Sequence, residues 1–261
     1  MLQTWQIKVF NRTVAISPFT YWVTDMDSIK ISSCWLIRAT ILLIMASILA
    51  GCGFGETENN SGTRTLNRSL NNTPESLDIH RFKSTEAGHL LRDLGEGLTS
   101  YTAAGKLIPG VAERWEVSSD GTQYTFFLRP SAKWSNGDDV LASDFLAAYR
   151  RLVTPSTAAA SAKFILMFKN ARPIIAGDLD PEFLGVEVVD ARTLVVTLEA
   201  PTPYLLQLLT HPSMFPIHRQ SLADHGDQFS RAGNLVSNGA YRLKDAESAS
   251  IFVLERNEHY W

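Results

Sequence analysis

The fold is decided by a stretch in the middle of the chain, residues 114–129, whose sequence is RWEVSSDGTQYTFFLR. Apolar and polar side chains alternate in both halves of this stretch, as they do in half-buried strands. Between the halves, Asp120-Gly121 supplies the positive φ that a tight turn requires. We therefore predict an antiparallel hairpin. Its aromatic residues are interpreted as core in preference to a stacking platform for a ligand, and with a neighbouring tryptophan they are Trp115, Tyr124, Phe126, Phe127 and Trp134.

Strands and helices are expected on both sides of this hairpin. Residues 65–70 alternate in polarity and predict an edge or half-buried strand. Residues 143–153 carry an apolar stripe at helical spacing, with Ser143 as the expected N-cap and Pro155 beyond the end. Such a mixture predicts an α/β chain, and we find no internal repeats. The remaining expected elements are a helix at 89–94, a hairpin of 186–189 with 193–198, a short helix ending at Leu209, and strands at 240–243 and 251–255.

Composition and charge exclude several classes of protein. The chain has 261 residues, of which 45% are hydrophobic and 20% charged, close to the averages of soluble globular domains. Disorder, collagen and a multi-span membrane protein are thereby excluded. With 24 Lys and Arg against 27 Asp and Glu, the formal net charge is -3, so no nucleic-acid partner is expected. The two cysteines, Cys34 and Cys52, are too few for a disulfide scaffold or a zinc site made of thiolates.

Common catalytic and cofactor motifs are missing from the sequence. It contains no Gly-x-Ser-x-Gly elbow, P-loop, dinucleotide fingerprint or His-Glu-x-x-His helix. Asp138-Asp139 could be a carboxylate pair, but the Asn-Gly sequence just before it indicates a tight turn, so we interpret both as turn residues. His218 and His225 lie seven residues apart and lack a third metal ligand. We therefore expect no enzyme, no metal site and no cofactor.

The N-terminal part has the features of a targeting segment. Residues 39–50, ATILLIMASILA, form an apolar run shorter than the roughly 20 residues that a membrane-spanning helix needs. Lys30 and Arg38 precede it, and it ends in Leu-Ala-Gly-Cys, residues 49–52. These four residues resemble the lipobox of bacterial lipoproteins, in which the cysteine is lipidated and becomes the mature N-terminus. The alternative is a buried helix with an incidental cysteine, but a polar stretch, GETENNSGTRT, follows at once.

We predict that residues 1–51 are a signal segment, that Cys52 is lipidated, and that residues 52–64 form a flexible tether. Signal peptides are roughly 15 to 30 residues long, so Met26 is the expected start of translation. Residues 1–25 are then expected to form no element of the fold. Because two acyl chains give stable anchoring, we expect the protein on a membrane surface, with its globular part in water.

An ordered series of short sequences resembles the family 5 extracellular solute-binding proteins of ABC importers. Any one of them would be weak evidence, whereas the whole series, running in family order from about Thr65 to Trp261, is specific to this family. It agrees with the lipobox, because many such binding proteins are exported and lipid-anchored. Its main members are SLDIH at 76–80, RDLGEGL at 92–98, PGVAERW at 109–115, YTFFLR at 124–129, AKWSNG at 132–137, TLVVTL at 193–198 and NGAY at 238–241.

The resemblance implies a class II periplasmic-binding-protein fold of the Venus-flytrap kind, with two large lobes and a smaller one. Residues 65–96 and 205–261 would form parts of lobe I, and residues 97–204 the smaller lobe II. Family members are about twice as long, so the chain is expected to be an N-terminal fragment that lacks the C-terminal lobe. In the family pattern a Thr caps the helix after residue 140, and Leu141 replaces it here.

The resemblance also implies a function. The chain would belong to the lipid-anchored substrate-binding component of an ABC peptide importer, which binds extended oligopeptides in the periplasm or at the cell surface and delivers them to the permease. Backbone pairing with the peptide would supply affinity independent of its sequence. The residues that match the family's ligand-binding positions are Lys83, Ser84 and Thr85 beside the peptide, Ser161 where the family has an aromatic residue, and Asn238 and Gly239 where the chain returns to lobe I.

Three alternatives remain open from the sequence. Without the resemblance, residues 83–85 would be interpreted as a solvated loop. The chain could be an inactive truncated remnant, or a family member that binds a dipeptide, a cell-wall peptide, nickel or haem. An envelope enzyme is a third class, against which the missing nucleophile and base motifs argue.

Overall fold

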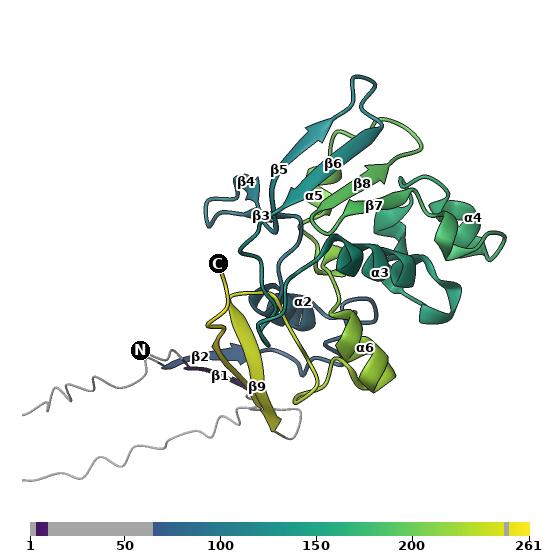
Figure 1. Cartoon of the computed structure of the whole chain (residues 1–261). Helices are drawn as coiled ribbons and strands as arrows, with labels where there is room; N and C mark the ends of the chain where they lie inside the picture. The colour runs from purple at the N-terminus through teal and green to yellow at the C-terminus, as the bar shows by residue number, and fades with distance from the viewer. Residues whose placement is uncertain (1–3, 10–64, 248–250) are drawn as a thin grey trace, which may run out of the picture. The chain divides into compact units, whose positions relative to one another are not determined.

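The structure is a computed structural model that describes residues 4–9, 65–247 and 251–261 (Figure 1). The chain divides into two units, residues 1–11 with 63–261, and residues 12–62. The second unit lies outside the described residues. The predicted signal core, Cys52 and most of the tether fall there, and remain predictions.

One four-stranded sheet joins the beginning and the end of the described chain. Its order is β2-β1-β10-β9, formed by β1 (Thr4–Val9), β2 (Thr65–Leu70), β9 (Tyr241–Glu247) and β10 (Ile251–Arg256). The strands predicted at 65–70, 240–243 and 251–255 are confirmed. β1 was not expected, since residues 1–25 were assigned no element, yet it runs parallel to β2 and antiparallel to β10. Its sequence, TWQIKV, alternates polar and apolar residues, which favours a strand.

The second four-stranded sheet contains both predicted hairpins. Its order is β5-β6-β8-β7, all antiparallel, from β5 (Ala112–Val117), β6 (Gln123–Leu128), β7 (Val186–Asp190) and β8 (Thr193–Thr197). Gly121 turns the first hairpin with a φ of 71°. A small hairpin of β3 (Thr99–Tyr101) and β4 (Leu107–Pro109) precedes it. The core interpretation is confirmed for three aromatics, since the buried side chains include Tyr124, Phe126 and Trp134.

The helices of the described residues are short, and α3 is the longest among them. It packs against β7 and β8 of the second sheet (Figure 1). The described helices are α2 (Thr85–Leu94), α3 (Ala142–Val153), α4 (Ala171–Ala176), α5 (Leu205–Leu208) and α6 (Arg219–His225). Short 3-10 helices occupy Pro155–Thr157, Ala160–Ile165, Pro181–Phe183, Pro212–Met214 and Gly226–Gln228.

The start of α3 differs from the prediction. The expectation that Ser143 caps this helix is wrong, because the N-cap is Leu141 and Ser143 lies inside the first turn. Leu141 has no side-chain oxygen to offer. Instead, its backbone N–H donates to the carboxylate of Asp144 at 3.0 Å, which is the returning half of a capping box. An acidic residue three positions on thereby allows an apolar residue to begin the helix.

Two hydrophobic clusters form the core. The larger lies between α3 and the second sheet and includes Phe126, Phe145 and Leu194. The other includes Leu90 of α2 and Leu254 of β10. They resemble the predicted lobes II and I, although Leu205, Leu209 and Met214 belong to the larger cluster and Phe215 to the other. α3 contributes Phe145 to the larger cluster and Ala148 to the other, so it joins the two clusters; the lobe boundaries themselves remain a prediction.

Candidate functional site

The candidate site is built around the turn that leads into α2. The carbonyl of Asp78 accepts hydrogen bonds from the backbone N–H groups of Arg81 and Phe82, both at 3.0 Å. After this turn, Ser84 is the N-cap of α2, and its Oγ accepts from the N–H of Ala87 at 3.3 Å. The predicted ligand segment, residues 83–85, is therefore not a free loop but the ordered start of a helix.

A carboxylate of the chain itself lies against this segment. One oxygen of Glu75 accepts hydrogen bonds from the backbone N–H groups of Lys83 and of Ser84, the latter at 2.9 Å. Partial burial acts to raise the pKa of Glu75, but hydrogen bonds from the Ser84 side chain and from the backbone lower it to about 2. At neutral pH this carboxylate is charged, and two backbone donors of the segment are occupied.

An open pocket of about 250 Å³ borders the segment. Its aromatic wall comes from Phe82, whose ring stacks on that of His211 with centroids 5.9 Å apart, and Phe164 contacts the same His211 at 4.4 Å. The pocket thus brings together the predicted residues and a part of the chain more than a hundred residues further on. It is lined by Phe82, Lys83, Ser84, Thr85, Gly88, Arg92, His211 and Pro212.

His211 is held in its neutral form. Its Nδ1 accepts a hydrogen bond from the backbone N–H of Ser213 at 3.2 Å, so the ring proton is on Nε2. Burial, and then the positive charges of Arg92 and Lys163, lower the pKa of His211 to about 4. The pocket therefore contains a neutral imidazole among cationic side chains.

A buried ion pair fixes the turn before the segment. Arg151, in the last turn of α3, donates from Nη1 to Asp78 Oδ1 at 2.9 Å and from Nη2 to Oδ2 at 2.6 Å. The same Nη1 lies 2.9 Å from Nδ1 of His80, which is fully buried. Burial acts to raise the pKa of Asp78, but the hydrogen bonds and charge of Arg151 leave it below its ordinary value. This bidentate contact ties the turn before residues 83–85 to α3.

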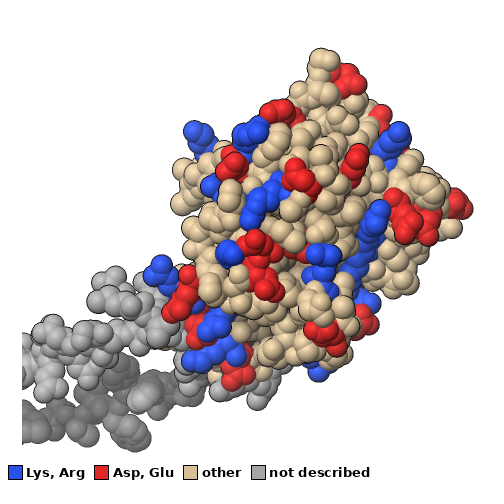
Figure 2. Space-filling model, viewed as in Figure 1, with Lys and Arg blue, Asp and Glu red and all other residues tan. Residues whose placement is uncertain are grey.

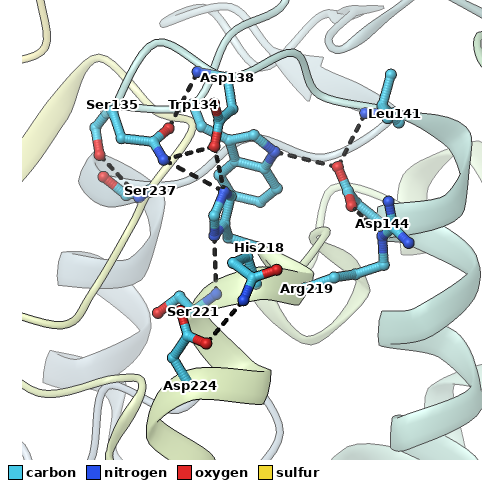
Figure 3. A network of polar contacts seen from close by, with 12 residues as sticks. Trp134, Ser135, Asp138, Leu141, Asp144, His218, Arg219, Ser221, Asp224 and Ser237 are labelled. Carbon is cyan, nitrogen blue, oxygen red and sulfur yellow. Dashed lines mark hydrogen bonds and ion pairs between the residues drawn. The ribbon is translucent and has the colours of Figure 1, made fainter.

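A second polar network joins the other end of α3 to α6 (Figure 3). The carboxylate of Asp144 accepts from Trp134 Nε1 at 3.1 Å and from Arg219 Nε at 2.8 Å. His218 Nε2 lies 3.0 Å from Asp138, which is exposed, and its Nδ1 accepts from the backbone N–H of Ser221 at 3.1 Å. This network borders a second, larger pocket of about 510 Å³.

The His218 and Asp138 pair does not form a nucleophilic centre within the described residues. The Ser221 hydroxyl donates to the carbonyl of Asn234 at 2.7 Å, away from the imidazole. Because the backbone already occupies Nδ1 of His218, that nitrogen cannot accept a proton without losing its hydrogen bond. The arrangement is suited to holding α6 against the residues before α3, and not to activating a nucleophile.

The other predicted site residues are engaged within the fold. Asn238 is 2% exposed, and its amide exchanges hydrogen bonds with the backbone of Glu96 at 3.1 and 2.9 Å. Gly239 donates to Leu94 O at 2.9 Å, and a Cβ on it would come within 2.5 Å of the backbone of Gly95. These two residues hold the end of α2 against the segment that leads into β9 of the first sheet. Their proposed contact with a ligand remains a prediction.

Ser161 lies apart from the pocket that residues 83–85 line. It is buried, and its hydroxyl has no hydrogen-bond partner among the described residues. The nearby Phe164 reaches the pocket through its contact with His211. Whether Phe164 takes the place of the family's aromatic residue beside a ligand remains a prediction to be tested.

Several residues of the site were not singled out from the sequence. Arg151 stands in a short family-like sequence, RLV, but nothing in it indicates a partner 73 residues away. His211 stands in another short family-like sequence, LLTHP at 208–212, but its place in this pocket was not predicted, and Glu75 was not considered at all. Among the described residues, no group of three or more His, Cys, Asp or Glu side chains could hold a metal ion. None of the described helices is long and apolar enough to cross a membrane.

Charges of both signs cover the surface. On the face shown in Figure 2, basic and acidic side chains are interspersed, so that face of the described residues offers no continuous basic surface. Neutralisation of nucleic-acid phosphates needs such a surface.

Comparison with known proteins defines the class to which this fold and site belong. Residues 106–261 match the bacterial extracellular solute-binding proteins, family 5, and the chain belongs to that family. The periplasmic oligopeptide-binding protein OppA of Salmonella typhimurium is 39% identical over 230 residues, which are 87% of this chain and 42% of that protein. The periplasmic murein peptide-binding protein MppA of Escherichia coli is 35% identical over 237 residues, 90% of this chain and 43% of its own length.

Solved structures agree with this assignment. The Haemophilus influenzae OppA complex with the peptide RPPGFSPFR has a TM-score of 0.68 and 42% identity, over 72% of this chain and 37% of that one. The predicted α/β, class II periplasmic-binding fold is confirmed. The chain spans less than half the length of these relatives, and it matches an N-terminal part of them.

Proposed function

We propose that the chain forms one side of the peptide site of a substrate-binding component, which serves the permease of an ABC peptide importer. The observation that carries the proposal is the ordered segment at residues 83–85, fixed by Arg151 beside an open pocket. A rigid edge of this kind suits recognition of a peptide main chain, since affinity then depends on backbone pairing and not on the peptide's sequence.

The contacts of Glu75 add a condition to this mechanism. A peptide carbonyl that pairs with the N–H groups of Lys83 or Ser84 must first displace the Glu75 carboxylate, because these donors are already occupied. The remaining lining of the pocket, including Phe82 and His211, is free of that constraint. Water in the open pocket can bridge to side chains of varied size.

Binding measurements test the proposal. The full chain with Cys52→Ala is titrated calorimetrically with a mixed tripeptide pool, in parallel with a chimera in which residues 65–261 replace the matching part of the Salmonella relative. We expect micromolar binding by the chimera, about -8 kcal/mol. Because the chain spans less than half of the length of this relative, we expect two contacts to the charged ends of a peptide to be absent when it is titrated by itself. Two such contacts at roughly 1.5 to 3 kcal/mol each would weaken binding by about two to four orders of magnitude.

Two outcomes would count against this reading. A chimera that folds, by circular dichroism, but binds no peptide would remove the proposed function. Micromolar binding by the monomeric chain alone would show an autonomous receptor and remove the idea that it forms only one side of the site.

We further propose that Cys52 is lipidated and anchors the protein on a membrane, in the periplasm or at the cell surface. The support is the Leu-Ala-Gly-Cys sequence that ends the apolar run. Replacement of Cys52 by Ala should move the protein from the membrane fraction to the soluble fraction. An unmodified mature N-terminus at any other residue, found by mass spectrometry, would refute the anchor. We also propose that translation begins at Met26, so that the exported protein lacks β1, and deletion of residues 1–25 should leave export unchanged.

A further inference from the structure

The pocket beside residues 83–85 is surrounded by basic side chains without acidic partners. Lys83 and Arg92 line it, and Lys163 lies over the ring of Phe164, 5.4 Å from its centroid. Among the described residues, none of these three cations forms an ion pair. The carboxylate of Glu75 is nearby, but its hydrogen bonds go to the backbone of Lys83 and Ser84.

We propose that this pocket is a subsite for a carboxylate of the bound ligand, which makes acidic peptides the preferred substrate class. The inference rests on the proposed peptide-binding function and deepens it. Two sources share this chemistry: an acidic side chain and the C-terminal carboxylate of a short peptide. A guanidinium and an ammonium on one pocket are the groups that bind carboxylates most strongly in proteins.

The pocket has the size expected for one chemical group of a ligand, and it is too small to enclose a whole ligand. Its volume of about 250 Å³ is below the roughly 300 to 1,000 Å³ of sites that enclose drug-sized molecules. The apolar walls, Phe82 and Pro212, can cover the methylene groups of an acidic side chain. The basic groups of Lys83 and Arg92 then remain for its charged end.

A carboxylate of the chain itself already lies against the start of α2. Glu75 uses two backbone N–H groups at the start of α2, where the positive end of the helix dipole favours an anion. A ligand carboxylate would be held differently, by side chains on the pocket side. These two anions do not compete for the same donors, so Glu75 and an acidic ligand can be bound together.

His211 provides an internal reporter of the subsite. Its pKa lies near 4 because it is buried and because Arg92 and Lys163 oppose a second positive charge. A carboxylate in the pocket would offset these cations and favour the protonated imidazole. Binding of an acidic ligand should therefore raise the pKa of His211, whereas a neutral ligand should lower it further by excluding water.

The experiment is an NMR titration of the full chain with Cys52→Ala, which can follow millimolar affinities. Three tripeptides separate the two sources of the carboxylate: Ala-Glu-Ala-amide has only the side-chain carboxylate, Ala-Gln-Ala only the terminal one, and Ala-Gln-Ala-amide neither. We expect one or both acids to bind about five-fold or more tightly than the neutral peptide, as each partly exposed cation contributes up to a few-fold. The His211 ring resonance, assigned with His211→Gln, should report a raised pKa with the same peptide.

Substitutions test which side chains cause the preference for an acidic peptide. Lys83→Met with Arg92→Met should remove the preference for the acid, and Lys83→Glu should reverse it toward Ala-Lys-Ala-amide. Lys106→Met, an exposed lysine on the β3 to β4 turn, is the matched control and should change nothing. Equal binding of all three peptides would overturn the subsite and leave the proposed function intact. The same three peptides are titrated into the chimera, and a response of neither the chain nor the chimera to any peptide would overturn both.

Discussion

The two ends of α3 are tied to the rest of the molecule by ion pairs that differ in burial and in the number of contacts. At the C-terminal end, Arg151 and Asp78 form a bidentate pair whose side chains are only 13% and 4% exposed. At the N-terminal end, Asp144 meets Arg219 through one contact of 2.8 Å, and the arginine side chain is 51% exposed. Each charge on α3 has the sign that the helix dipole favours at its end.

The difference lies in how each buried carboxylate is compensated. Asp78 has one close cation, Arg151, because Nε of Arg81 lies 3.9 Å away, and it also accepts a backbone hydrogen bond from His80. Asp144 also receives hydrogen bonds from the indole of Trp134 and the backbone of Leu141, so its arginine is one donor of three. A buried charge with a single counter-charge is stable only while that partner stays. The C-terminal end of α3, which holds the turn before residues 83–85, is therefore the more vulnerable of the two.

The largest effect is expected from Arg151→Met. It leaves the Asp78 carboxylate buried without its counter-charge, which typically costs about 3 to 5 kcal/mol. We expect the free energy of unfolding in urea to fall by this amount, a large share of the roughly 5 to 15 kcal/mol of a typical domain.

The double variant Asp78→Asn with Arg151→Met provides the control. It removes both charges, so it should recover part of the stability lost by Arg151→Met alone. If the double variant is as unstable as the sum of the two single changes, the pair is not the unit that we describe.

Asp144→Ala should have an intermediate effect. It leaves Trp134 Nε1–H buried and without an acceptor, and it removes the hydrogen bond to the Leu141 backbone that starts α3. An unsatisfied buried donor costs about 1 to 3 kcal/mol, so we expect a loss of about 2 kcal/mol in urea unfolding. Asp144→Asn keeps one acceptor oxygen and should lose less. A loss below 0.5 kcal/mol in Asp144→Ala, roughly the size of an ordinary surface change, would contradict the shared compensation.

Local sequence patterns predicted α3 itself and the sheet against which it packs. The stripe at residues 143–153 predicts α3, and the alternation around Asp120-Gly121 predicts the sheet that it covers. The cap was mispredicted because the rule favours a hydroxyl side chain, while Asp144 satisfies the backbone of Leu141 from within the helix. β1 was missed because a signal segment was expected there, although its alternating sequence was in view.

The contacts between distant residues could not be predicted in the same way. Asp78 and Arg151 lie 73 residues apart, and His218 and Asp138 lie 80 apart. No periodicity links such positions, since they meet only after α3 has packed between the two hydrophobic clusters. The resemblance to a family identified residues 83–85, but the occupation of their backbone by Glu75 is a geometric fact that no motif encodes.

The pH dependence of stability should separate the two ends of α3. Burial, and then the charge of Arg151, lower the pKa of His80 from 6.5 to about 3. The unfolded chain therefore takes up this proton first as the pH falls. The stabilisation is fully present above pH 6.5 and is lost progressively between 6.5 and 3, by up to about 1.4 kcal/mol per pH unit.

The test compares urea unfolding at pH 7 and pH 5.5. The wild-type chain should lose about 1 kcal/mol over this interval from His80, to which His211 adds a loss in the same direction. His80→Gln should reduce the loss, whereas Asp144→Ala should retain it. An unchanged slope in His80→Gln would show that this histidine does not titrate differently in the folded state.

The smallest effect is expected from Arg219→Ala, which tests the ion pair at the N-terminal end of α3. Asp144 would keep its hydrogen bonds from Trp134 and Leu141, and half-exposed ion pairs contribute about 0.2 to 1 kcal/mol. Arg68→Ala is the matched control, because Arg68 also forms one contact, 2.7 Å from Asp93, with 41% of its side chain exposed. Both changes should cost less than about 1 kcal/mol, and both costs should shrink in 1 M salt, where the Debye length is roughly 3 Å. A loss in Arg219→Ala that equals that of Asp144→Ala and resists salt would show that the arginine alone compensates the carboxylate, and the two ends of α3 would then be built alike.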